Sequence, residues 1–440
     1  MPSITSITPS TFDSGRSVTL AGSGFGSVQG TVLIGGVSQT VTSWSDTSIT
    51  FTTSRSSQSM GSCRVNVQKA ATLSGGNAAL GWSAASLADG NTLTITTNGT
   101  YSFGSTGPTL VYYDDYSTSS VGSPASTTPM LGRGTVTANS DGAPYVESCT
   151  GMPYGRGIAI GAEGSAGQNS TDYRQLIVVD TARHTEFFES FYHCYPQANQ
   201  DNAQTYLNST STWQVKGIWH YFSSNGYSAA DDSDVIAATQ LYFSSGGYYT
   251  AGEMVGSNSS PTSSATVFNG PSGLRGATNI PYLRTDPLLR QMWVKCAALG
   301  SQPTGTDGMY RVLDSVNGVT READFANVAY WDDSGAAQAG FDRFTLPGYA
   351  RGYLRNAAAH MYFGQVYQAV GAGSAARVEI GDNASYASAK KLSICTVDSW
   401  GNSSITAKIR TGVFHTSGVS SLWFYIHDAN NDLIATGQLS

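Results

Sequence analysis

Ser43-Trp44-Ser45-Asp46-Thr47-Ser48-Ile49-Thr50 recurs near the other end of this chain, as Ser399-Trp400-Gly401-Asn402-Ser403-Ser404-Ile405-Thr406. Each copy follows a short apolar stretch that ends in Ile-Gly, at Val32-Leu33-Ile34-Gly35 and at Val378-Glu379-Ile380-Gly381. Short alternating runs bounded by glycine are typical of β-strands. A repeat of this kind marks a repeated structural unit. The sequence therefore predicts one small β module near each end, with a long segment between them.

The composition predicts an all-β protein of several domains. A chain of 440 residues is longer than one hydrophobic core normally supports. Only 12% of its residues are charged, against roughly 25% in an average soluble domain. Polarity comes instead from serine, threonine, asparagine and glutamine, and the 50 glycines and 24 tyrosines indicate many turns and aromatic surfaces. The 40% of hydrophobic residues are enough to build packed cores.

Charge and hydropathy exclude several classes of function. The net charge is −7 and the chain has no run of lysine or arginine, so the basic footprint of a nucleic-acid-binding protein is absent. No apolar run approaches the roughly 20 residues of a membrane span, so we expect no membrane insertion. The first residues resemble no secretory signal. The five cysteines are widely spaced and indicate free thiols in a reducing cytoplasm.

Residues 1–70 read as a small sandwich of strands of about five residues separated by glycine turns. The segment Ile4-Thr5-Ser6-Ile7-Thr8-Pro9 is followed by Gly15, Val18-Thr19-Leu20, Gly22, Gly24-Phe25-Gly26 and Val32, Ile34-Gly35-Gly36. This ordered set resembles an IPT/TIG immunoglobulin-like domain. The resemblance implies a spacer or interaction module rather than a catalytic one.

The same alternation of apolar and polar residues predicts two further β segments. Residues 71–108 form a connecting β segment with one clear strand, Leu93-Thr94-Ile95-Thr96, which we expect to pack on the first sandwich. Residues 376–440 carry the second copy of the repeat and are predicted to form a C-terminal β sandwich similar to an IPT domain. Trp44 and Trp400 are expected to anchor the cores or rims of their modules.

Residues 109–375 are predicted to form one large jelly roll, because strand patterns dominate there and helical periodicity is scarce. The order of the elements resembles that of concanavalin A-like lectin/glucanase domains, including those of polysaccharide lyases. The resemblance is carried by the stretches Tyr113-Asp114-Asp115-Tyr116, Glu186-Phe187-Phe188-Glu189-Ser190-Phe191-Tyr192, Lys216-Gly217-Ile218-Trp219-His220-Tyr221-Phe222, Gln291-Met292-Trp293-Val294-Lys295 and Met361-Tyr362-Phe363-Gly364-Gln365-Val366-Tyr367.

Catalytic candidates are few. A glycosidase needs two carboxylates roughly 5–10 Å apart, and the glucanases of this fold present two glutamates on one face of a strand. Glu186 and Glu189 are three residues apart, so we expect them on opposite faces of a regular strand. A lyase needs a tyrosine or histidine base beside a cation. His220 is a candidate base, and scattered further members of such a set are His193, Tyr221, Arg284, Arg290 and Lys295.

Aromatic residues near glycine-rich loops are candidates for glycan binding, because sugars bind to aromatic faces supplemented by a few polar groups. They are Tyr242, Tyr248, Tyr249, Tyr330 and Trp331, with Arg351 as a cation for an acidic sugar. Loop packing or subunit contacts are the alternative use of these rings. Asp231, Asp232 and Asp234 are the candidate ligands of a calcium ion, which prefers carboxylates on a flexible loop; Asp-rich turns without a metal are the alternative.

The combination of modules resembles tailed-phage virion surface proteins, which are assembled in the host cytoplasm. We therefore predict a non-enzymatic virion protein of a capsid decoration or a tail adhesion apparatus. Its expected partners are other virion proteins, further copies of itself and a cell-surface glycan bound by the jelly roll. The alternative is a polysaccharide lyase or glycoside hydrolase acting as a depolymerase. A third reading is an extracellular or cell-surface lectin of a bacterium.

Overall fold

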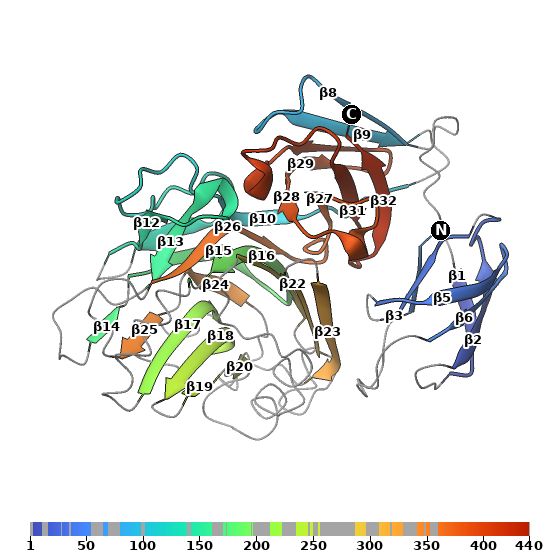
Figure 1. The fold of residues 1–440 in the computed structure, drawn as a ribbon, viewed down its shortest axis with the longest axis horizontal. Helices are drawn as coiled ribbons and strands as arrows, with labels where there is room; N and C mark the ends of the chain where they lie inside the picture. Colours follow the sequence, from blue (N-terminus) through green and yellow to red (C-terminus); the bar gives the residue numbers. More distant parts are fainter. Residues whose placement is uncertain are drawn as a thin grey trace.

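A computed structural model provides the structure of the chain, and Figure 1 shows its fold. Strands make up nearly all of its regular structure, which confirms the all-β prediction. The only helices in the part of the chain that the structure describes are single 3₁₀ turns, and none could cross a membrane. The described residues are 3–10, 16–27, 29–34, 37–53, 65–68, 80–97, 102–138, 142–160, 170–172, 174–194, 196, 212–221, 235–244, 247–249, 254–255, 287–295, 308–316, 319–328, 341–346, 349–352 and 360–439.

The first sandwich consists of two antiparallel sheets close to the N-terminus. One sheet has the order β1-β2-β6-β5 and the other the order β4-β3-β7. Its core contains the alternating apolar residues of β2 and β6 together with Phe25, and Trp44 packs against it. The strands are β1 (Ser3–Thr8), β2 (Ser17–Ser23), β3 (Thr31–Ile34), β4 (Val37–Ser38), β5 (Thr40–Trp44), β6 (Ser48–Thr52) and β7 (Val65–Gln68).

The second sandwich is assembled from two distant parts of the chain. Strand β9 pairs with β30 from Ser404↔Thr96 to Lys408↔Thr92, which gives a sheet of order β29-β30-β9-β8. A second sheet of order β28-β27-β31-β32 completes it. The strands are β8 (Leu80–Ala84), β9 (Thr92–Thr97), β27 (Arg377–Gly381), β28 (Leu392–Ile394), β29 (Thr396–Trp400), β30 (Ser404–Lys408), β31 (Trp423–His427) and β32 (Leu433–Gln438).

This arrangement corrects the predicted place of the segment that follows residue 70. We expected its strand to pack on the first sandwich, but both β8 and β9 belong to the C-terminal module. Figure 1 shows the two early strands lying across the late ones. The reason is a shared core: Leu93 and Ile95 of β9 are fully buried in one cluster with Ile405 and Ala407 of β30. The chain therefore begins the second sandwich, leaves it, and returns to complete it after residue 376.

The two sandwiches repeat each other beyond the tryptophan motif. In the first, the Phe25 amide donates to the Asp46 carbonyl, and Trp44 Nε1 donates to the Gly26 carbonyl at 2.9 Å. The second makes the equivalent bonds, which are Phe103 N–H to the Asn402 carbonyl at 2.9 Å and Trp400 Nε1 to the Gly104 carbonyl at 3.1 Å. A Phe-Gly pair thus occurs in each sandwich, as Phe25-Gly26 and as Phe103-Gly104. Each pair makes the same two hydrogen bonds to the tryptophan hairpin of its own sandwich.

The jelly roll is inserted into the second sandwich between β9 and β27. It consists of two stacked antiparallel sheets, named here by their place in Figure 1. The upper sheet has the order β12-β13-β26-β16-β21-β22-β23, with β10 also paired to β26. Its strands are β10 (Thr109–Asp114), β12 (Tyr145–Ser148), β13 (Arg156–Ile160), β16 (Glu186–Cys194), β21 (Leu288–Lys295), β22 (Gly308–Val316), β23 (Val319–Val328) and β26 (Met361–Val370).

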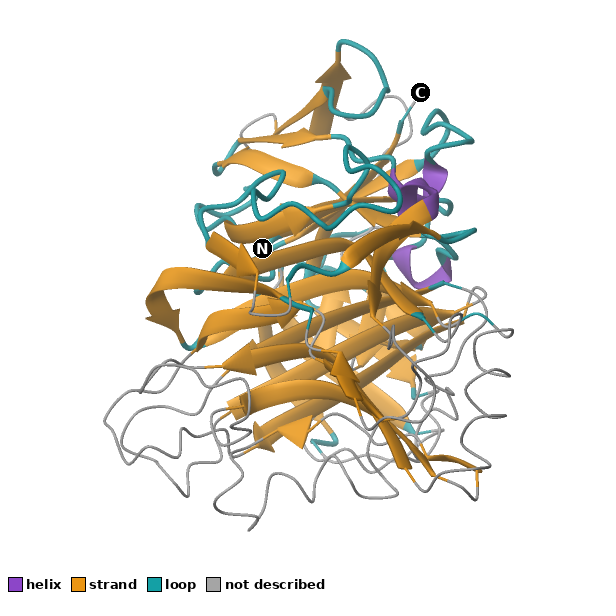
Figure 2. Ribbon diagram, turned by 90° about the vertical axis from the view of Figure 1, so that its left-hand side faces the viewer, coloured by secondary structure: helices purple, strands orange, loops and turns teal. Residues whose placement is uncertain are grey.

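The lower sheet has the order β11-β15-β24-β17-β18-β19, and the short strands β14, β20 and β25 join it. Its inner face packs on the upper sheet, as in the contact of Phe344 with Phe187 (ring centroids 5.8 Å apart). Figure 2 shows the stacked layers from the side. The strands are β11 (Thr135–Ala138), β14 (Ser170–Asp172), β15 (Leu176–His184), β17 (Thr212–Tyr221), β18 (Val235–Ser244), β19 (Gly247–Tyr249), β20 (Met254–Val255), β24 (Phe341–Leu346) and β25 (Tyr349–Gly352).

The second sandwich covers the outer face of the upper sheet. Tyr192 on β16 donates from its hydroxyl to the Leu392 carbonyl at 2.6 Å, and the Arg377 guanidinium lies 4.5 Å from the centre of the Phe188 ring. Gln291 on β21 donates to the Glu379 carboxylate. Three 3₁₀ turns flank these contacts, at Pro153–Gly155 (η1), Tyr386–Ser388 (η3) and Gly412–Phe414 (η4). One broad face of the jelly roll is therefore occupied by the chain itself.

Candidate functional site

The lower sheet brings three of the predicted glycan-binding residues into one row. Gln214 on β17 pairs with Arg351 on β25 from one side and with Tyr242 on β18 from the other. Tyr242 in turn pairs with Tyr249 on the edge strand β19. Neighbouring strands lie about 4.8 Å apart, so the row Arg351–Gln214–Tyr242–Tyr249 spans about 14 Å. Arg351, Gln214 and the Tyr242–Tyr249 hairpin are far apart in sequence, and the strand register aligns them.

The register also assigns the row to one face of the sheet. Ala238 and Tyr242 lie four residues apart on β18, so they share a face. Ala238 pairs with Trp219, and Trp219 pairs with Thr345 on β24. The neighbouring residue Phe344 packs on the upper sheet, so position 345 belongs to the opposite face. The row therefore lies on the outer face of the lower sheet, away from the upper sheet.

The remaining glycan candidates have different places. Tyr248 pairs with Phe243, one position along from the row, so alternation puts it on the other face. Lys216 and Tyr349 pair with each other next to the row and share its face, although only the register reveals this. Tyr330 and Trp331 lie outside the described residues.

The two glutamates are on opposite faces of β16, as predicted. Glu186 accepts a hydrogen bond from Trp293 Nε1 at 2.8 Å, in the layer of side chains beneath the second sandwich. Glu189 accepts one from Gln368 Nε2 at 2.6 Å and is fully buried between the two sheets. Glu186 is itself 9% exposed. Each carboxylate is thus enclosed by side chains of its own fold, and neither lies near the row on the lower sheet.

Of the histidine and arginine candidates, His193 and Arg290 lie near each other. His220 pairs with Phe344, so its position belongs to the inner face of the lower sheet. His193 is buried against the Phe363 ring, and burial lowers its pKa to about 3, so it is a neutral core residue at physiological pH. Arg290 is 1% exposed. Arg284 lies outside the described residues. His193 and Arg290 lie near each other on the upper sheet, where the Arg290 charge also lowers the His193 pKa, whereas His220 belongs to the lower sheet.

The Tyr-Asp-Asp-Tyr stretch is a buried hydrogen-bonded turn. Asp114 accepts from the Tyr116 amide at 2.7 Å, and Asp115 accepts from the Tyr113 hydroxyl at 2.9 Å and the Ser117 amide at 2.9 Å. Burial raises the pKa of Asp114 to about 7. The described residues contain no cluster suited to a metal ion. The predicted calcium ligands Asp231, Asp232 and Asp234 lie outside the described residues and remain a prediction.

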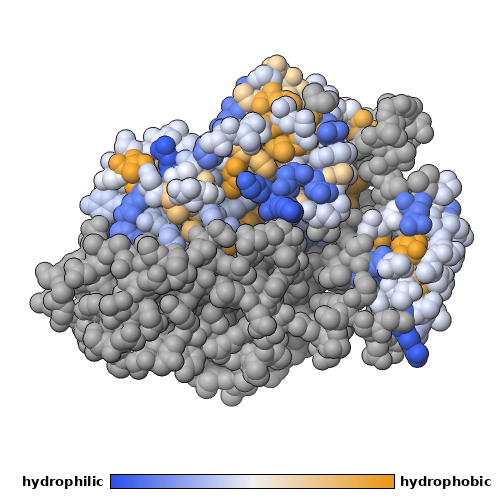
Figure 3. Space-filling model, in the orientation of Figure 1, coloured by the Kyte–Doolittle hydropathy of each residue, from blue (hydrophilic) through white to orange (hydrophobic). Residues whose placement is uncertain are grey.

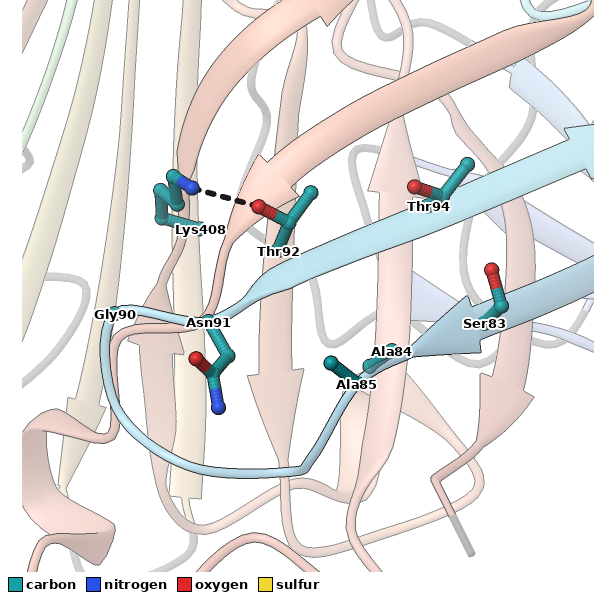
Figure 4. A pocket seen from close by; sticks show the side chains of 8 residues that line it. All are labelled: Ser83, Ala84, Ala85, Gly90, Asn91, Thr92, Thr94 and Lys408. Carbon is teal, nitrogen blue, oxygen red and sulfur yellow. Dashed lines mark hydrogen bonds between the residues drawn. The ribbon is translucent and has the colours of Figure 1, made fainter.

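A shallow polar pocket lies on the second sandwich, where β8, β9 and β30 meet (Figure 4). Its lining includes the hydroxyls of Ser83, Thr92 and Thr94, and Lys408 donates to Thr92 Oγ1 at 2.6 Å. No aromatic residue lines it. Figure 3 shows a surface on this module in which hydrophobic residues are interspersed with hydrophilic ones. The pocket therefore lacks an aromatic surface on which a sugar could stack.

Comparison with known proteins confirms the nature of the first sandwich. Residues 2–79 match the model of the IPT/TIG domain family. A search of curated proteins finds no match for the chain.

Solved structures resemble the chain at low identity. A PL-14 alginate lyase from Aplysia kurodai is 8% identical, with a TM-score of 0.34, and the match covers 51% of this chain and 87% of the lyase. The alginate lyase vAL-1 from Chlorella virus is 10% identical (TM-score 0.32; 54% and 93% covered). A GH131 β-glucanase catalytic domain from Podospora anserina is 11% identical (TM-score 0.28; 59% and 95% covered). Likenesses this distant assign no activity to the chain.

Proposed function

We propose that this protein is a non-enzymatic glycan-binding protein that uses the outer face of the lower sheet. The observation that carries the proposal is the row Arg351–Gln214–Tyr242–Tyr249. Two aromatic residues, an amide and a cation are the residue types that hold a sugar chain through stacking, hydrogen bonding and charge. A length of about 14 Å suits an oligosaccharide better than a single sugar.

The covered upper sheet supports this choice of face. A sandwich has two broad outer faces, and contacts such as Tyr192 with Leu392 and Gln365 with Ser393 (2.7 Å) fill the upper one with the second sandwich. A long polymer therefore has no access to Glu186 or to Gln291 while the two domains are docked. The lower sheet is the broad face that the second sandwich leaves uncovered.

The proposal is tested by glycan-array screening of the full chain, followed by calorimetric titration of the glycans that bind. Changing Tyr249→Ala or Arg351→Ala is expected to weaken binding by about tenfold or more, which corresponds to about 1.4 kcal/mol. Tyr248→Ala is the matched control, because Tyr248 neighbours Tyr249 but belongs to the opposite face. If Tyr248→Ala and Tyr249→Ala weakened glycan binding equally, with the Tm of both unchanged, the row would not be the binding site.

We further propose that the protein is displayed on a tailed-phage virion, as a capsid decoration or part of the tail adhesion apparatus. This part rests on the combination of two small sandwiches with one large jelly roll, which resembles virion surface proteins. The sandwiches would bind other virion proteins or further copies of the chain. Immunogold electron microscopy of purified particles tests it: label on the head or the tail tip supports the proposal, and the absence of label on every particle contradicts it.

A second candidate function is a polysaccharide lyase acting at the same row. The favouring observation is that Arg351 and Tyr242 flank Gln214, which aligns a cation and a phenol on one face. A lyase needs such a base beside a cation that neutralises a uronate. Incubation with polyuronates distinguishes the two functions. Ultraviolet absorbance of an unsaturated product that vanishes in Tyr242→Phe supports the lyase, and binding without product supports the glycan-binding protein.

A further inference from the structure

Two cysteines from separate parts of the chain lie in one cluster beneath the second sandwich. Cys194 is the last residue of β16, and Cys149 directly follows β12. The Cys149 amide donates to the Gly155 carbonyl at 2.9 Å, which folds the chain after β12 back over the sheet. Both side chains belong to one buried cluster that also contains Met152 and Tyr192. Neither cysteine forms a disulfide in the structure.

The two thiols are chemically unequal. Cys194 donates a hydrogen bond to Cys149, and this bond lowers the pKa of the Cys149 thiol even though the residue is buried. Cys149 is 6% exposed and follows a strand end, whereas Cys194 is 1% exposed within the sheet. Cys395 offers a contrast: it lies in a different cluster, and burial raises its pKa to about 12. Of these three, Cys149 has the most reactive environment, because the thiolate is the attacking form.

We propose that Cys149 and Cys194 form a reversible disulfide when the protein meets a disulfide oxidant. In a reducing cytoplasm the pair stays as two thiols that pack in the cluster. Outside the cell the oxidised form is favoured. The bond would join the loop after β12 to the end of β16, which are far apart in sequence, and cross-links of that kind restrict the unfolded chain strongly.

The exchange proceeds in two balanced steps with glutathione disulfide as the oxidant. The Cys149 thiolate attacks one glutathione sulfur, which forms a protein–glutathione mixed disulfide and releases one glutathione thiolate. Cys194 then loses its proton and attacks the Cys149 sulfur, which releases the second glutathione. Two protein thiols are oxidised, one glutathione disulfide is reduced to two glutathione molecules, and the protein loses two hydrogens.

The location gives the bond a consequence for domain docking. The cluster that holds both cysteines also contains Leu392 and Tyr425 from the second sandwich. Tyr192, two residues before Cys194, donates its hydroxyl to the Leu392 carbonyl. A disulfide here would therefore fix the loop and the strand end on which the second sandwich rests. Oxidation is expected to raise the Tm of the docked domains.

The test uses the reduced full chain with Cys63 and Cys296 changed to serine. The chain is incubated with glutathione disulfide under native conditions, quenched with acid, alkylated in denaturant and mapped by mass spectrometry. We expect one linked peptide pair that contains Cys149 and Cys194, a mass loss of about 2 Da from two hydrogens, and a higher Tm that dithiothreitol reverses. Recovery of both cysteines in alkylated form, or a different linkage, overturns the proposal.

Single variants test the order of the steps. Cys194→Ser is expected to leave a stable glutathione adduct on Cys149, because the second thiol is missing. Cys149→Ser is expected to leave Cys194 without an adduct, because that thiol is the more buried one. Cys395→Ser is the matched control and should preserve the linked pair. An adduct that forms on Cys194 but not on Cys149 would contradict the assigned roles.

Discussion

Trp400 donates a hydrogen bond from its indole nitrogen to the carbonyl oxygen of Gly104, 3.1 Å away and 296 positions earlier in the chain. The whole jelly roll lies between these two residues in sequence. Trp44 makes the equivalent bond to Gly26 at a sequence distance of 18. The same local interaction therefore closes a continuous domain in one case and a divided domain in the other.

Changing Trp400→Phe should destabilise the second sandwich by about 1 kcal/mol or more, because the phenyl ring is smaller than the indole and cannot donate the hydrogen bond. Trp44→Phe should do the same to the first sandwich. Differential scanning calorimetry of the full chain provides the measurement, since separate domains give separate transitions. The two variants are expected to lower different transitions, and a shift of the same transition in both would contradict the division into two sandwiches.

Gly373→Ala should destabilise the protein by about 3 kcal/mol or more, because a Cβ at this position would lie 2.0 Å from the Gly107 carbonyl oxygen. Gly107 and Gly373 lie where the chain enters and leaves the jelly roll, and their backbones touch. Gly401→Ala is the matched control, since its nearest contact would be an ordinary 3.5 Å. Urea unfolding should show a lower midpoint only for Gly373→Ala. Comparable losses in both variants would show that the crossing point is not tightly packed.

Glu379→Gln should weaken docking between the second sandwich and the jelly roll. The Glu379 carboxylate is fully buried, is 2.9 Å from Arg377 Nε and accepts a bond from Gln291. Removing its charge leaves a buried guanidinium without its ion partner, which typically costs about 3–5 kcal/mol. The exposed pair Lys408–Asp398, 3.7 Å apart, is the control, and Asp398→Asn should cost below about 1 kcal/mol. Limited proteolysis and Tm measurements compare the two variants, and only Glu379→Gln should be cleaved faster and melt at a clearly lower temperature.

Asp114 should make the jelly roll less stable as pH rises from 4 to 7. Burial raises the pKa of its carboxyl from 3.8 unfolded to about 7 folded. The folded state therefore binds the proton more tightly, and this stability is complete below the unfolded pKa and lost as pH rises through the folded one. Asp114→Asn removes the titration. The Tm of the wild type relative to the variant should fall with increasing pH across this interval, and a constant difference would contradict a buried, protonated Asp114.

The sequence was sufficient to predict the strands and the repeat, but not every partner strand. The motif around Trp44 and Trp400 identified two modules, and alternation identified the strand at Leu93–Thr96. Nothing local specifies which edge such a strand joins, because its alternation fits any sheet with an apolar inner face. The Phe-Gly pairs at Phe25 and Phe103 were the available signal, since each contacts the tryptophan hairpin of its own sandwich.

The candidate site was predictable in its residue types rather than in its geometry. Tyr242, Tyr249 and Arg351 were selected for chemistry, and the register then aligned them. Their alignment depends on hydrogen bonds among four strands, which no short stretch of sequence determines. Gln214 and Lys216 were missed for the same reason. The opposite placement of Glu186 and Glu189 was predictable, because their spacing along one strand is a local property.

The insertion of the jelly roll into the second sandwich also determines how tension travels along the chain. A pull between the first sandwich and the C-terminal strand enters at β8 and leaves at β32, and both strands belong to the second sandwich. The hydrogen bonds of these two edge strands, β8 with β9 and β31 with β32, are the first to bear the load. The jelly roll is joined to the second sandwich by two adjacent connections, one after β9 and one before β27. No force therefore acts along the jelly roll until the second sandwich unfolds. A domain inserted in this way would keep its shape while the rest of the protein is under mechanical strain.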